Sequence, residues 1–140
     1  MIPYYGVFNM LGDLIYEAKG KVKGMRVLDE NGTTELTLQE QGVLFGIECS
    51  TTLTHVSKPE LNECNTWKGT TLLTKDGDTV TFTISGITIP KGLSPLSSFR
   101  GAVFCRTQSP KLSRLNSVIC ICEAEMNKDT SYCVKAWEWK

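Results

Sequence analysis

The chain has 140 residues, of which 41% are hydrophobic and 21% charged, close to the average of globular domains. This length suits one domain with its own core and is too short for two ordinary domains. Lys plus Arg and Asp plus Glu number 15 each, so the formal net charge is zero. That balance argues against a nucleic-acid partner and is compatible with a homo-oligomer.

The N-terminal sequence MIPYYGVFNMLGDLIYEAKG has neither the basic start nor the long apolar run of a secretory signal. No apolar stretch is long enough to span a membrane. We therefore expect a cytoplasmic protein without membrane contact, consisting of one domain over 1–140. Residues 1–12 are predicted to be an N-terminal extension that packs on it. In that compartment the six cysteines are expected to be reduced thiols.

Apolar and polar residues alternate along most of the chain, which is the period of β-strands. Residues 79–84 read TVTFTI and 131–139 read SYCVKAWEW, both rich in β-branched or aromatic residues. Turn sequences such as Asn31-Gly32 and Asp76-Gly77 separate the runs. Short helical turns are expected at most over 58–64 and 109–115. Eight strands are predicted, at 14–28, 34–41, 43–54, 66–74, 78–88, 99–107, 116–126 and 131–139.

Glycines within the predicted strands favour a closed barrel over a sandwich. Glycine weakens a strand and often marks the bend or bulge where a sheet curls. Closure also removes the exposed edges that a strand-rich chain must otherwise protect. The sequence therefore predicts an all-β fold, a single closed antiparallel barrel of about eight strands. The glycines to which we attribute closure are Gly20, Gly24, Gly46 and Gly101.

Motifs for the commoner catalytic and cofactor sites are missing from the sequence. His55 is the only histidine, and no serine lies in a Gly-x-Ser-x-Gly elbow, so nothing supports a hydrolase triad. Phosphate-binding glycine loops are also missing, so no nucleotide cofactor is expected. Cys120 and Cys122 share a strand face, but without a C-x-x-C pair they are better interpreted as buried thiols than as metal ligands. We expect neither a metal nor a cofactor.

Charged residues embedded in apolar strands are the remaining candidates for a site. On an open sheet such residues would face solvent. If several point inward, they must be paired or line a polar pocket, because an unpaired buried charge is very costly. Aromatic residues from other strands could pack as core or wall the same cavity. The candidate lumen residues are Glu17, Arg26, Glu48, Arg100, Arg106 and Glu123, with Trp67, Phe104 and Trp137.

Three segments resemble a family of small bacterial and archaeal barrel proteins similar in shape to the allene oxide cyclase barrel, within the wider lipocalin-like group. They are GDLIYEAKGKVKGMRVL near the start, FRGAVFCRTQSPKLSRLN, and the closing WEWK. The resemblance implies an eight-stranded antiparallel barrel with a central cavity. Members of the wider group include cyclases and isomerases that act on small hydrophobic substrates, and carriers without chemistry. No catalytic residue can be carried over, because no active-site motif matches.

Three functions therefore remain open. The first is a barrel that binds a small, largely apolar molecule in its lumen, since barrel mouths are common ligand sites. The second is a cofactor-independent cyclase or isomerase that acts on a small hydrophobic substrate in the lumen. The third is a structural or oligomerisation module. A carboxylate meeting an arginine in a closed pocket would favour the enzyme, whereas Glu48 and Arg100 being exposed and unpaired would remove its residues.

Overall fold

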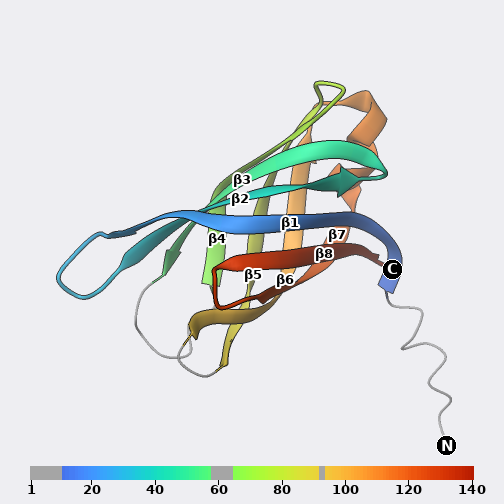
Figure 1. The fold of residues 1–140 in the computed structure, drawn as a ribbon. Helices are drawn as coiled ribbons and strands as arrows, with labels where there is room; N and C mark the ends of the chain where they lie inside the picture. Colours follow the sequence, from blue (N-terminus) through green and yellow to red (C-terminus); the bar gives the residue numbers. More distant parts are fainter. Residues whose placement is uncertain (1–10, 58–64, 92–93) are drawn as a thin grey trace, which may run out of the picture.

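Eight antiparallel strands form a closed barrel in the computed structural model of the chain (Figure 1). The structure describes residues 11–57, 65–91 and 94–140, with backbone alone at 57, 65–70, 90, 91 and 94–97. Each strand pairs with the next, and β8 pairs back onto β1, which confirms the predicted fold class. The elements are β1 (Leu11–Val27), β2 (Thr34–Leu44), β3 (Ile47–Ser57), β4 (Asn65–Thr74), β5 (Thr79–Lys91), β6 (Ser94–Thr107), the 3-10 helix η1 (Pro110–Ser117), β7 (Ile119–Met126) and β8 (Ser131–Trp139).

The alternation that predicts the strands also sorts their side chains into an inner and an outer face. On β8, Tyr132, Val134 and Ala136 are buried, while Cys133 and Lys135 between them are exposed. A similar alternation runs through β2. Because successive side chains of a strand point to opposite sides, the inner faces of all eight strands meet inside the barrel and form its core.

The connection between β2 and β3 differs from the prediction. Phe45 and Gly46 form a two-residue turn with φ angles of 49° and 77°. Two consecutive positive φ angles are typical of the type I′ turn, whose twist matches that of the strands it joins. The prediction that Gly46 bends a strand from within is therefore wrong. It is a turn residue, placed where the backbone needs a left-handed conformation.

Other glycines lie where strands pair irregularly or face one another. The register between β1 and β2 shifts between Val22 and Gly24, as expected for a bulge that bends a strand. Gly101 on β6 lies directly opposite Gly86 on β5. Of the predicted helical turns, the one over 109–115 corresponds to η1, and β7 consequently starts at Ile119. The turn predicted over 58–64 lies outside the described residues.

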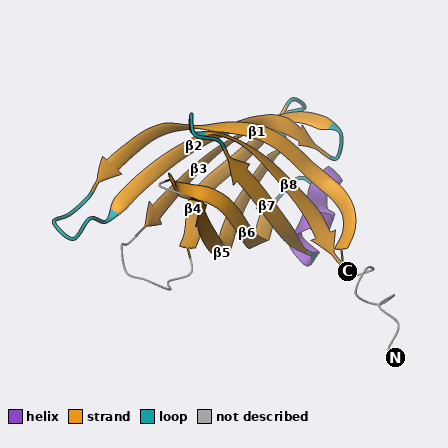
Figure 2. Cartoon of the chain, turned by 60° about the horizontal axis from the view of Figure 1, so that its bottom comes forward, coloured by secondary structure: helices purple, strands orange, loops and turns teal. Residues whose placement is uncertain are grey.

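The two ends of the barrel are built differently. At one end, called here the helix end, η1 joins β6 to β7 (Figure 2). Its Leu112 and Leu115 are buried. At the other, called here the hairpin end, the β1–β2 hairpin extends beyond the barrel wall (Figure 1). Pairing of β1 with β2 runs to Val27, whereas its pairing with β8 stops at Lys21. The lumen therefore has a floor on one side and an extended wall on the other.

The start of the chain is described only from Leu11 onward. Leu11 and Gly12 belong to β1, and Leu11 pairs with Trp139 of β8. They are thus part of the barrel wall and not of an extension. The rest of the predicted N-terminal extension, 1–10, lies outside the described residues. Within the described chain, no helix has the length and apolar character needed to cross a membrane.

Candidate lumen site

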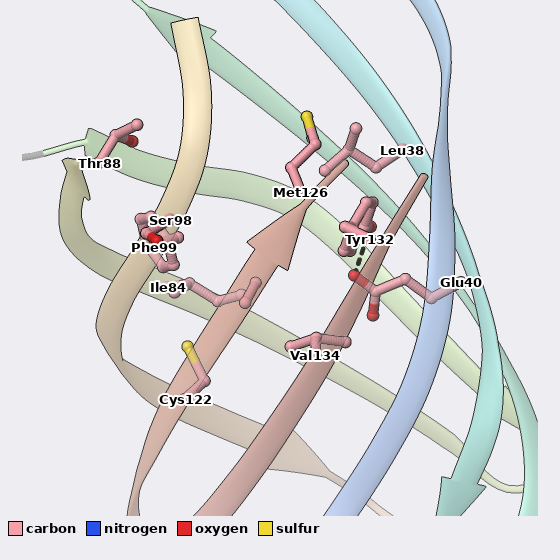
Figure 3. A pocket seen from close by; sticks show the side chains of 11 residues that line it. Leu38, Glu40, Ile84, Thr88, Ser98, Phe99, Cys122, Met126, Tyr132 and Val134 are labelled. Atoms are coloured by element: carbon pink, nitrogen blue, oxygen red, sulfur yellow. Dashed lines mark hydrogen bonds between the residues drawn. The ribbon is translucent and has the colours of Figure 1, made fainter. Parts of the chain in front are cut away.

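The barrel interior holds two adjoining chambers. The chamber at the hairpin end has about 520 Å³ of empty space and the one at the helix end about 530 Å³, each including space continuous with solvent. Glu40, Ile84, Cys122 and Val134 line both. Figure 3 shows the hairpin-end chamber, whose remaining lining residues are Leu38, Thr88, Ser98, Phe99, Ala124, Met126 and Tyr132. The walls are mostly apolar, which makes the few polar groups conspicuous.

Glu40 on β2 is the acidic residue that lines both chambers, and it is only 4% exposed. Strand register explains its surroundings. Gly20 on β1 lies opposite Glu40 on one side and opposite Tyr132 of β8 on the other. Because Gly20 has no side chain, the Tyr132 ring can cross β1, and its hydroxyl donates to Glu40 Oε2 at 2.6 Å (Figure 3).

The other carboxylate oxygen has its own donor. Tyr16 Oη donates to Glu40 Oε1 at 2.7 Å and lies 2.9 Å from Thr51 Oγ1. Since a phenol has a single hydrogen, which goes to Glu40, Thr51 must donate to Tyr16. Three hydroxyl groups are thus ordered around one carboxylate. We call Glu40, Tyr16, Tyr132 and Thr51 the Glu40 cluster.

Burial sets the protonation behaviour of this cluster. It raises the pKa of Glu40, and the hydrogen bonds from Tyr132 and Tyr16 act in the opposite direction by stabilising the carboxylate. Burial also raises the pKa of both tyrosines, and the charge of Glu40 adds to this. The two phenols therefore remain neutral donors at physiological pH.

Several cysteines are placed in or near the lumen. Burial, followed by the charge of Glu40, raises the pKa of Cys49 to about 11 and that of Cys122 to about 12, so both are thiols at neutral pH. Cys105 and Cys120 line the helix-end chamber, and a hydrogen bond to Cys120 raises the pKa of Cys105. Among the described residues, no three His, Cys, Asp or Glu side chains are grouped so as to hold a metal ion.

The floor at the helix end combines apolar packing with one ion pair. Leu115 of η1 lines the helix-end chamber, and this residue is only 1% exposed. Arg114, the preceding residue, bonds the nearly buried carboxylate of Glu138 on β8. Its guanidinium also lies 4.9 Å from the centre of the Phe45 ring. These contacts hold the short helix across the end of the barrel.

The charged residues predicted to line the lumen do not do so. They alternate with inward residues, so strand parity turns them outward: Glu123, for example, lies between Cys122 and Ala124, which line the lumen. Glu123 is half-buried and Arg100 is exposed. Arg100 Nε lies 3.6 Å from Glu123 Oε2, and Arg100 Nη2 lies 2.9 Å from Glu125 Oε1. Exposed pairs also join Arg26 to Glu35, Glu48 to Lys75 and Glu17 to Lys135. Arg106 is exposed as well.

Two of the three predicted aromatic residues, Phe104 and Trp137, lie outside the lumen. Phe104 is 48% exposed on the outer face of β6. Trp137 is half-buried on the outer face of β8, in register with Leu14 and Ile121. Trp67 lies on β4 opposite His55, and its side chain is outside the described part of the chain. Neither Phe104 nor Trp137 lines a chamber.

The Glu40 cluster was missed, although a signal for it exists. In TELTLQEQ, Glu40 shares the parity of Leu36 and Leu38, which marks a carboxylate on an apolar strand face. Tyr132 likewise shares the parity of Val134 and Ala136. Parity could have placed these side chains inside a barrel. It could not have shown that strands β1, β2 and β8 bring them together.

Comparisons with known proteins bear on the fold alone. No protein-family model matches the chain, and no curated protein matches it. A protein of unknown function from Clostridium acetobutylicum has a similar structure, with a TM-score of 0.72 at 12% identity over 91% of this chain and 98% of that one. A beta-barrel like protein from Acinetobacter baumannii has a TM-score of 0.70 at 13% sequence identity, and the match covers 93% of this chain and 95% of that one. A conserved protein of unknown function from Rhodopseudomonas palustris has a TM-score of 0.67 at 14% sequence identity, and the match covers 91% of this chain and 97% of that one. The chain therefore has the fold of small β-barrel proteins whose functions are not known.

Proposed function

We propose that this protein binds a small, largely apolar molecule in its lumen, with one polar group of the ligand held at the Glu40 cluster. The observation that carries this proposal is the pair of apolar chambers that meet at a buried, hydrogen-bonded carboxylate. Ligand sites in proteins combine mostly apolar walls with a few convergent polar groups in this way. The proposal also accords with the resemblance to allene oxide cyclase-like barrels.

Filling the hairpin-end chamber should weaken this binding. We expect 2-phenylethanol to bind the wild-type protein with one-to-one stoichiometry in a calorimetric titration. Ala124 lines this chamber, so Ala124→Phe should weaken binding at least about tenfold, because a ring would occupy the ligand's volume. Near-UV circular dichroism would establish that the variant is folded.

Ala102→Phe is the matched control. Ala102 is half-buried and lies on β6 opposite Ile121, on the outer face, and it lines neither chamber. The same change in size there should leave the affinity for 2-phenylethanol unchanged. Equal binding by the wild type and Ala124→Phe would contradict a ligand site in the hairpin-end chamber. No binding by the wild type would contradict a ligand site in the lumen.

A cyclase or isomerase is the second candidate, favoured by the raised pKa of Glu40 beside two phenols. A carboxylate in an apolar site can move a proton on a bound substrate. If so, the wild type should speed exchange of the α-hydrogens of phenylacetone with D2O, and Glu40→Gln should not. Equal rates for both proteins, followed by proton NMR, would leave binding as the function.

A further inference from the structure

When Glu40 is ionised, no positive side chain among the described lumen residues balances its charge. Glu40 is buried between the chambers, and the residues that line both chambers include no lysine, arginine or histidine among the described side chains. Arg114, at the helix end, is already bonded to Glu138. Hydrogen bonds from neutral phenols reduce the cost of a buried carboxylate, but they bring no positive charge to it.

The hydrogen-bond arrangement favours the charged form of Glu40. Tyr16 and Tyr132 each donate to a different carboxylate oxygen, at 2.7 and 2.6 Å, and Thr51 supports Tyr16 from behind. Donors on both oxygens stabilise a carboxylate more than a carboxylic acid. A carboxylate can accept about four hydrogen bonds, so lone pairs remain for a ligand that enters from either chamber.

The walls around the carboxylate suit a cation that also has an apolar body. Tyr132 and Phe99 line the hairpin-end chamber, and Tyr16 and Phe82 line the helix-end chamber. Aromatic rings attract organic cations through their negative faces, most strongly where water is excluded. Negative charge and aromatic walls together disfavour an anionic ligand such as a carboxylic acid.

We infer that the ligand of this lumen is a small lipophilic amine, bound as its ammonium ion to Glu40 with its apolar part in one of the chambers. This inference rests on the proposed function and narrows it to one chemical class. The ammonium ion provides the counter-charge that the described lumen residues lack, so ligand and site each satisfy the other's buried charge.

Three probes of one shape test this directly. 2-Phenylethylamine, 2-phenylethanol and 3-phenylpropanoate share a phenyl ring on a short chain and differ in the charge of the end group. By calorimetry at pH 7, the wild-type protein should bind the amine at least about tenfold more tightly than the alcohol, as expected for a charge-assisted contact in a desolvated site. The carboxylate should bind most weakly.

Glu40→Gln should remove the preference. The amide keeps the shape of the side chain but carries no charge, so we expect the variant to bind the amine no more tightly than 2-phenylethanol. Glu123→Gln is the matched control, because Glu123 lies on the outer face beside Arg100 and should not affect either probe. If Glu40→Gln does not fold, the ranking of the three affinities on the wild-type protein still tests whether the lumen prefers the amine.

The two proposals fail differently. If the wild type binds the alcohol as tightly as the amine, or binds the carboxylate best, the amine inference is overturned and a lumen ligand site survives. If Glu40→Gln is folded and retains the tenfold preference for the amine, the inference is likewise overturned. If none of the three probes binds, the proposed function itself fails.

Discussion

Gly20→Ala is expected to lower the free energy of unfolding by about 3 kcal/mol, the sum expected for overpacking and for loss of a hydrogen bond to a charged group. A Cβ atom on Gly20 would lie 2.4 Å from Cζ and 2.5 Å from Oη of Tyr132. The ring must then move, and movement breaks the bond from its hydroxyl to Glu40. Urea unfolding followed by tryptophan fluorescence would measure the change.

Gly24→Ala is the control on the same strand. Nothing lies within 4 Å of a Cβ built at Gly24, so this change should alter stability by less than about 0.5 kcal/mol. Removing the ring by Tyr132→Val should also remove most of the cost of Gly20→Ala, because the two residues then no longer clash. Equal effects of Gly20→Ala and Gly24→Ala on stability would mean that the position of the Tyr132 ring does not depend on the missing side chain at Gly20.

His55 should make the protein sensitive to mild acid. It lies on β3 with no exposed surface, and burial lowers its pKa from 6.5 to about 4. The unfolded state therefore binds the proton at a higher pH than the folded state does. The contribution of His55 to the free energy of unfolding is therefore at its maximum above pH 6.5 and falls as the pH drops towards 4. The two pKa values imply that the free energy of unfolding decreases by about 3 kcal/mol over this range.

Glu40 acts in the opposite sense. Its pKa is raised above 4.5 in the folded protein, so its contribution favours the folded state at low pH and is lost as the pH rises through that folded value. To isolate the histidine, unfolding free energies of the wild type and of His55→Gln would be compared from pH 7.5 to pH 4. We expect the difference between the two to change by about 3 kcal/mol across this range. Parallel curves would show that His55 does not titrate as its burial requires.

The strands were predictable because they depend on local pattern. Alternation places Tyr132, Val134 and Ala136 on one face of β8 whatever the neighbouring strands are, and turn residues separate one run from the next. The turn at Phe45 and Gly46 was missed because phenylalanine is unusual at a positive φ. Its position is set by the pairing of β2 with β3, which no short window of sequence contains.

The site was not predictable in the same way. The charged candidates were chosen because they interrupt apolar runs, but residues such as Arg100 and Glu48 interrupt them on the outer face, where ion pairs with Glu125 and Lys75 are exposed. Parity within a single strand places Glu40 among inward residues. It says nothing of which donors will face that carboxylate from other strands.

The sequence by itself determined the strands and the alternation of side chains between their two faces, because both follow from a period of two and from turn chemistry that acts over a few residues. Only the tertiary structure decided where the functional groups meet. Tyr132 reaches Glu40 across 92 positions of the chain, and it does so because strand closure places β8 beside β1 and because Gly20 leaves room for the ring. Contacts of that range arise from register and closure together, which the pattern of any one strand does not contain.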